Sequence, residues 1–216
     1  MGRAPSLCGV ILAAGESTRM GADKALLPWP PIAPGATPTG QTFLSAAIQA
    51  LSLFNDMVIV VAGKNAQSLA PLVYANGGVL VTNPAPERGQ FSSLQIGLQE
   101  VLSHGRDAAM VTLVDRPPVT SATLHDLHAA FVQALARGTW AVVPEYQGKH
   151  GHPILVTREM IEAFLKAAPT ASARDIEHQN QAHIEYVPVT DPFVAMNVDT
   201  PADYAALSTP ALAQPK

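Results

Sequence analysis

The stretch Leu12–Lys24 reads LAAGESTRMGADK and decides how the rest of the 216-residue chain is interpreted. It follows the apolar run Leu7–Ile11, whose composition predicts a buried strand. Two glycines inside the stretch allow the backbone to curl, so that successive amide N–H groups point at one place and can bind an anion. Arg19 and Lys24 add positive charge there. The stretch therefore predicts a cradle for a polyphosphate at a strand end, with a plain turn and two solvated cations as the alternative.

Two common phosphate-binding motifs do not fit this stretch. A P-loop places its lysine directly after the second glycine, whereas Ala22 and Asp23 separate Gly21 from Lys24 in this chain. No G-x-G-x-x-G pattern follows the strand, which argues against a dinucleotide-binding fold of that type.

Length and composition limit the fold classes and the kinds of partner that the chain can have. The length suits a single α/β domain over residues 1–216 with a sizeable core. Charged residues make up 14% and the net charge is −4, which argues against nucleic-acid binding through clustered Lys and Arg. The chain has no apolar run of membrane-spanning length, and its single cysteine, Cys8, excludes an intrachain disulfide. We expect a soluble, cytoplasmic protein that binds neither nucleic acid nor membrane.

Strands and helices alternate along the chain, which predicts a doubly wound, mostly parallel sheet. In such sheets, ligands bind beyond the carboxyl ends of the strands. Prolines at positions 28, 30, 31, 34 and 38 predict a stiff loop beside the cradle, either a flap or a passive surface loop. We expect further strands at 57–62, 79–82, 108–114 and 140–143, helices at 43–54, 66–74, 92–102 and 121–136, and a helix followed by a strand within 171–189.

Two aspartates stand out against this pattern. Asp115 ends the apolar run 108–114, so it is predicted at a strand end facing the cradle, where a carboxylate can bind Mg²⁺ together with phosphate oxygens. Asp199 precedes Thr200, which forms a capping-box signature with Asp203. The side chain of Asp199 is therefore free to point elsewhere. Turn or helix-cap chemistry alone is the alternative for both residues.

The run from Leu12 to Pro28 resembles the signature of the MobA-like NTP transferases. This family includes the molybdenum cofactor cytidylyl- and guanylyltransferases and the sugar-phosphate nucleotidyltransferases. The resemblance extends to about Leu207. It implies a Rossmann-like, three-layer α/β/α fold with a mostly parallel sheet. It also implies Mg²⁺-dependent transfer of a nucleoside monophosphate from an NTP to a phosphorylated acceptor, with release of pyrophosphate.

The resemblance implies a role for individual residues. It assigns catalysis to Lys24 and Arg19, Mg²⁺ to Asp115 and Asp199, and substrate binding to His152, which otherwise fixes the shape of its loop. Val114 and Asn197 depart from the family pattern, which has glycine and aspartate there. For Ser93, whose neighbour Ser92 is a candidate helix cap, the alternative is ordinary helix-start chemistry. Nucleotide binding is assigned to Leu12, Ala13, Ala14, Gly15, Arg19, Lys24, Ser93 and Asp115.

The base and the acceptor are inferred from shorter motifs. Ala13-Ala14-Gly15 resembles the cytidylyl branch, whereas guanylyltransferases tend to have glycine at both positions after Leu-Ala. Together with Gly151-His152-Pro153, this favours CTP as donor and molybdopterin as acceptor, with possible transient contact to a molybdoenzyme or its chaperone. GTP and sugar or polyol phosphates are the alternatives. A non-catalytic, nucleotide-binding delivery module is disfavoured because Lys24 and both aspartates are present.

Overall fold

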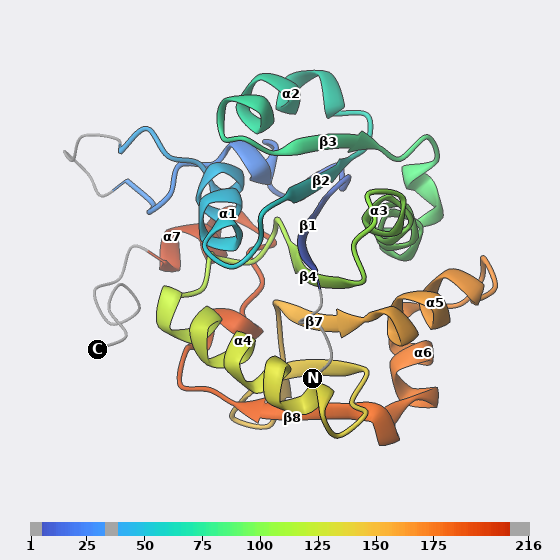
Figure 1. Cartoon of the computed structure of the whole chain (residues 1–216). Helices are drawn as coiled ribbons and strands as arrows, with labels where there is room; N and C mark the ends of the chain where they lie inside the picture. Colours follow the sequence, from blue (N-terminus) through green and yellow to red (C-terminus); the bar gives the residue numbers. More distant parts are fainter. Residues whose placement is uncertain (1–5, 33–38, 208–216) are drawn as a thin grey trace.

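A computed structural model describes residues 6–32 and 39–207 of the chain. Its centre is an eight-stranded sheet in the order β3-β2-β1-β4-β7-β5-β6, with β8 paired to β5 (Figure 1). β7 runs antiparallel to β4 and β5, and β6 antiparallel to β5, while the other pairs are parallel. The strands are β1 Leu7–Ala13, β2 Val58–Ala62, β3 Val79–Thr82, β4 Ala108–Leu113, β5 Ala141–Tyr146, β6 Lys149–His150, β7 Ile154–Thr157 and β8 Ile184–Pro188.

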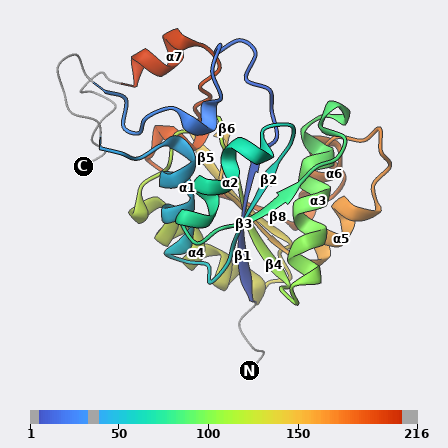
Figure 2. The same ribbon diagram turned by 90° about the horizontal axis from the view of Figure 1, so that it is seen from above.

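Helices cover both faces of the sheet, as Figure 2 shows from above. Buried side chains of α1, α2 and α4 form one core, and those of α3, α5 and α6 form the other. The predicted three-layer α/β/α fold is therefore confirmed. The helices are α1 Phe43–Ser52, α2 Ala66–Ala75, α3 Gln90–Ser103, α4 Ser121–Leu135, α5 Arg158–Lys166, α6 Ala173–Gln179 and α7 Pro201–Ala206, and the 3₁₀ helices are η1 Lys24–Leu26, η2 Pro86–Arg88, η3 Gln181–His183 and η4 Pro192–Ala195.

The central strand β1 shows why the sheet forms. All of its residues are buried. Alternate side chains enter opposite cores, with Ile11 packing beneath α1 and α4 and Leu12 packing on the α3 side. β1 pairs in parallel with both β2 and β4, so that Leu12 is opposite Val61 and Leu113. The loops that follow β1 and β4 consequently leave the sheet at the same edge.

The start of α3 differs from the prediction. The helix begins at Gln90, two residues before Ser92, and its N-cap is Gly89 with φ 91°, a conformation that favours glycine. Ser92 lies inside the first turn, where its hydroxyl donates to the Gly89 carbonyl at 2.7 Å. The interpretation of Ser92 as the helix cap is therefore wrong, because the glycine turn begins the helix instead.

A third, smaller core fastens the carboxyl-terminal segment to the loop after β1. It contains Met20, Phe43, Phe193 and Val198, with Trp29 packed against it. The Trp29 ring meets Phe43 edge-on at 5.0 Å. Residues 33–38 of the proline-rich loop lie outside the described residues, so the flap prediction stays a prediction, but Trp29 itself is a fixed part of this core. No helix within residues 6–32 and 39–207 combines the length and apolarity needed to cross a bilayer.

Candidate active site

The loop after β1 is curled and internally hydrogen-bonded. Ser17 and Gly21 adopt positive φ angles of 50° and 72°. The Ser17 hydroxyl accepts a hydrogen bond from the Lys24 amide at 3.2 Å, and the Asp23 carboxylate accepts one from the amide of Ala25 at 3.0 Å. Asn65, which precedes α2, donates its side-chain amide to Asp23 at 2.8 Å. These contacts set the path of the loop and fix where the Lys24 side chain begins.

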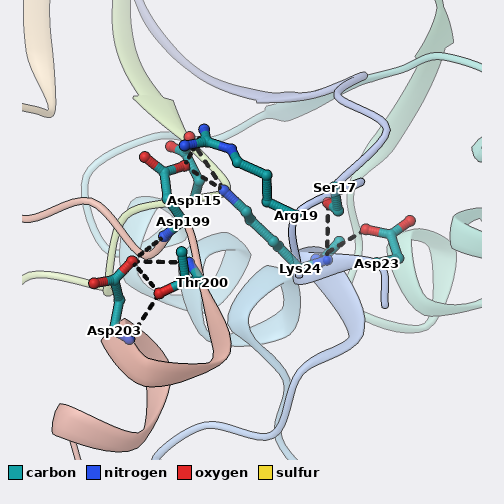
Figure 3. A network of polar contacts seen from close by, with 9 residues as sticks. Ser17, Arg19, Asp23, Lys24, Asp115, Asp199, Thr200 and Asp203 are labelled. Atoms are coloured by element: carbon teal, nitrogen blue, oxygen red, sulfur yellow. Dashed lines mark hydrogen bonds and ion pairs between the residues drawn. The ribbon is translucent and has the colours of Figure 1, made fainter. Parts of the chain in front are cut away.

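Lys24, Asp115 and Asp199 converge beside this loop (Figure 3). The Lys24 Nζ atom lies 2.8 Å from Asp199 Oδ1 and 3.9 Å from Asp115 Oδ2. Arg19 reaches the same Asp199 oxygen with its Nη2 atom at 3.2 Å. Lys24 is only 8% exposed, whereas the Arg19 side chain is 70% exposed. The structure thus brings together four predicted site residues from three distant parts of the chain.

Both aspartates are positioned by the backbone around them. Asp115 follows β4, and its carbonyl accepts the Val198 amide at 2.8 Å, which holds the two segments side by side. Thr200 and Asp203 form the predicted capping box, so the Asp199 side chain is left to face Lys24. Val114 fits without glycine: its side chain is buried and its amide donates to Leu12 O at 3.0 Å, which extends the β1–β4 pairing.

The two carboxylates have different electrostatic surroundings. Burial raises the pKa of Asp115, although Lys24 and Arg116 act in the opposite direction. The hydrogen bond from Lys24 lowers the pKa of Asp199. The ammonium group therefore stabilises the charge of Asp199 most strongly, and Asp115 is left as a partly desolvated carboxylate that benefits from additional positive charge.

The donor set fits a hydrated Mg²⁺ ion. Asp115 Oδ1 is buried and has no hydrogen-bond partner, so it has an unused lone pair for a cation. Within the described ranges 6–32 and 39–207, no group of three or more His, Cys, Asp or Glu side chains gathers as a metal site. Asp115 and Asp199 would therefore hold the ion as a pair, with water and phosphate oxygens as its other ligands. Mg²⁺ is commonly bound in this manner.

A small pocket of about 200 Å³ opens beside the start of the loop. Of the residues predicted to bind nucleotide, Leu12, Ala14, Gly15 and Ser93 line it. The Ser93 hydroxyl is buried and accepts a hydrogen bond from Asn83 at 2.9 Å. Three further lining residues lie in η2 and at the start of α3. They were not among the residues predicted to bind nucleotide, although the proline and glycine before α3 were visible signals. These residues are Pro86, Gly89 and Gln90.

Ala13 is placed differently from its neighbours. Its side chain is 1% exposed and packs in the core beneath α1 and α2, away from the small pocket. Its carbonyl accepts a hydrogen bond from Asn65 at 3.0 Å. Ala13 therefore shapes the loop through its backbone, and nucleotide binding by this residue stays a prediction.

A larger cleft of about 1210 Å³ adjoins the small pocket, because Leu12, Gly89 and Gln90 line both. His152 lines this cleft, away from the Lys24 cluster. Its amide donates to the Val194 carbonyl at 2.8 Å, and burial together with Arg116 lowers its pKa to about 3. A Cβ atom on the preceding Gly151 would lie 2.1 Å from the same carbonyl oxygen, so the close approach requires glycine. His152 thus both shapes its loop and faces the cleft.

Comparisons with known proteins agree with this arrangement. The MobA-like NTP transferase domain family matches residues 9–184. The molybdenum cofactor cytidylyltransferase of Escherichia coli strain K12 is 24% identical over 197 residues, which cover 90% of this chain and 92% of that protein.

Two further relatives cover nearly the whole chain. The molybdenum cofactor guanylyltransferase of Xanthomonas euvesicatoria is 27% identical over 202 residues, 92% of this chain and 93% of that protein. The crystal structure of Rv0371c from Mycobacterium tuberculosis H37Rv superposes with a TM-score of 0.77 and 26% identity, and the match covers 95% of this chain and 98% of that one. With its curled loop, its paired aspartates and the family match over residues 9–184, the chain belongs to the MobA-like NTP transferase domain family.

Proposed function

We propose that the chain transfers a nucleoside monophosphate from an NTP to a phosphorylated acceptor and releases pyrophosphate. The observation that carries this proposal is the convergence of Lys24, Asp115 and Asp199 beside the curled loop after β1. Asp115 and Asp199 would hold Mg²⁺, which neutralises phosphate charge when bound. Family membership supports nucleotidyl transfer as the reaction class.

The protein's own groups position and stabilise the reacting phosphates. An oxygen of the acceptor phosphate attacks the α-phosphorus in line, and the bond to the pyrophosphate leaving group breaks. Little covalent work falls to the protein in such a step, so its contribution is alignment and charge stabilisation. We assign the α-phosphate to Lys24, and the rest of the triphosphate to Arg19 and the amides of residues 14–21.

Lys24 must change partners for this role. In the structure its ammonium group is bonded to Asp199, whereas in the reaction it faces the α-phosphate. The exchange is favourable because the phosphate offers a second anionic acceptor at the same place. Arg19 is largely exposed and can follow the triphosphate as it binds.

We propose CTP as the donor and the molybdenum cofactor pterin as the acceptor. Ala14 lines the small pocket, and glycine at this position would lack its methyl group. This feature and the match to the Escherichia coli cytidylyltransferase support CTP. The slightly higher identity to the Xanthomonas guanylyltransferase favours GTP as the second candidate.

The test is a screen for pyrophosphate release. The four NTPs are supplied with Mg²⁺ and molybdopterin, and Asp115→Ala serves as the inactive variant. We expect turnover with CTP above that with GTP, and a loss of about 100-fold or more in Asp115→Ala with the fold intact. Near-normal release by Asp115→Ala contradicts the site assignment, and selective turnover of GTP contradicts the choice of base.

A further inference from the structure

Arg116 lies at the boundary between the Lys24 cluster and the large cleft. It directly follows Asp115, whose carboxylate faces Lys24, but its own side chain lines the cleft, which Asp115 does not. Arg116 therefore borders the cleft while its charge still acts on Asp115, whose pKa it helps to lower. A group bound by Arg116 in the cleft lies next to the place assigned to the reacting phosphates.

The guanidinium group of Arg116 is held in place but only partly used. Its Nη1 atom donates to the Val194 carbonyl at 2.8 Å, the same oxygen that accepts the His152 amide. Its Nε atom is buried and has no hydrogen-bond partner. In the described ranges 6–32 and 39–207, no carboxylate forms an ion pair with Arg116 within 4.0 Å. A buried donor without an acceptor is unfavourable unless a ligand supplies one.

His152 contributes a second unpartnered atom to the same wall. Its Nδ1 is buried without a hydrogen-bond partner, and the residue lines the cleft beside Arg116. Burial and the adjacent guanidinium lower its pKa, so the imidazole is neutral at physiological pH. A neutral imidazole offers one donor and one acceptor, which suits a neighbouring phosphate or hydroxyl oxygen. Arg116 is then the charged member of the pair.

Other cations in the cleft are less suited to this role. Arg88, Lys149 and Arg174 also line it, but their side chains belong to exposed residues. Arg116 is partly buried and is fixed by Val194, so less conformational freedom is lost when it binds an anion. Its guanidinium edge also matches the geometry of a phosphate, which it can contact through two N–H groups.

We propose that Arg116 binds the phosphate of a phosphomonoester acceptor in the large cleft and holds it beside Asp115, in line with the α-phosphate. The direction of attack rests on the proposed function, whereas the binding of phosphate does not. In the step itself, an acceptor phosphate oxygen forms a bond to the α-phosphorus. The bond from the α-phosphorus to the bridging oxygen breaks, and its electron pair leaves on pyrophosphate. Arg116 offsets the repulsion between the incoming dianion and the triphosphate.

Inorganic phosphate is the probe, and calorimetric titration of the full chain without nucleotide is the measurement. We expect Arg116→Gln to weaken phosphate binding by about 10-fold to 100-fold, the range for a hydrogen bond to a charged group. Arg158→Gln is the matched control, because it removes one positive charge from α5 outside the cleft. We expect this control to change binding by less than about twofold.

Phosphate can also bind at the loop after β1, where we assign the triphosphate. The effect of Arg116→Gln is therefore measured a second time in a protein that carries Arg19→Gln. In Arg19→Gln, we expect Arg116→Gln to weaken phosphate binding by the same factor, because the two arginines then serve separate sites. Unchanged binding in Arg116→Gln, or a loss that disappears in the Arg19→Gln background, overturns the proposal. If Arg116→Gln does not fold, Arg116→Lys replaces it. That variant keeps the charge and loses the planar fork, so phosphate affinity equal to wild type overturns the proposal.

Thermal stabilisation by CTP with Mg²⁺ is measured on the same variants. Arg116→Gln is expected to keep this stabilisation, because its side chain does not line the small pocket. Loss of phosphate binding with CTP stabilisation retained supports both proposals. If Arg116→Gln loses phosphate binding while the wild-type protein shows no stabilisation by CTP, the Arg116 site stands and the nucleotide assignment is contradicted.

Discussion

Replacing Lys24 with methionine should make the nucleotide-free protein bind a divalent cation more tightly. The ammonium group is 2.8 Å from Asp199 and 3.9 Å from Asp115, so its positive charge acts on both carboxylates that we assign to the metal. A partly buried pair at the shorter distance contributes about 1 kcal/mol, and the longer contact contributes about half as much. Their sum corresponds to about a tenfold gain in affinity for the cation. Methionine removes the ammonium group and keeps an unbranched stem of nearly the same length for packing.

The assay is titration with Mn²⁺, followed by electron paramagnetic resonance without nucleotide. Arg19→Met is the control: its side chain is 70% exposed and forms an ion pair with Asp199, so we expect a gain of about twofold. The same Lys24→Met variant should lose transfer activity by about 100-fold or more, because the α-phosphate loses its cation. Mn²⁺ binding that is unchanged or weaker in Lys24→Met refutes the reasoning that the lysine and the metal compete for the same two carboxylates.

Three further predictions concern the walls of the site. Gly151→Ala should lower the free energy of unfolding by about 2 kcal/mol in urea titrations, because its Cβ would meet the Val194 carbonyl at 2.1 Å; a stability equal to wild type contradicts this close approach. The pKa of His152 is lowered to about 3 by burial, so the unfolded state takes up its proton first as the pH falls from about 6.5. The free energy of unfolding should therefore fall as the pH is lowered from about 6.5 to about 3, by at most about 1.4 kcal/mol per pH unit. His152→Gln should make this dependence of stability on pH weaker. Ala14→Gly should raise kcat/KM for GTP relative to CTP, since it removes a methyl group from a residue that lines the small pocket; an unchanged ratio contradicts base selection by Ala14.

Local signals in the sequence sufficed for much of the fold. The apolar runs at β1, β2 and β4 predicted buried parallel strands, and the structure confirms them. Thr200 and Asp203 were identified as a capping box from their spacing alone, and they form one. These features are formed by residues that are close together in the sequence, so one sequence is enough to predict them.

Features set by tertiary packing were harder to predict. β7 is only Ile154–Thr157 and runs directly into α5 at Arg158, so no loop residues mark the boundary between them. The helix α5 was not predicted, although its buried residues Met160, Ile161 and Phe164 have helical spacing. The ion pair of Lys24 with Asp199 joins residues 175 positions apart. Its geometry depends on the small aromatic core that fastens the carboxyl-terminal segment to the loop after β1. The sequence predicted a shared site but not that the lysine would bond to the aspartate.

The direction in which the Arg116 side chain points also depends on tertiary packing. The sequence alone does not indicate where the Arg116 side chain points. In the structure, its guanidinium group bonds to the carbonyl of Val194, which belongs to η4. Packing of η4 against the loop after β4 decides this direction, and no local pattern encodes it.

A crystal structure of the chain with CTP and Mn²⁺ would test the central claim most directly. Anomalous scattering locates the metal, and the electron density locates the triphosphate. We predict one ion bonded to carboxylate oxygens of both Asp115 and Asp199, with Lys24 Nζ moved from Asp199 to the α-phosphate. A triphosphate bound away from the loop after β1, or an ion that contacts neither aspartate, would contradict the account.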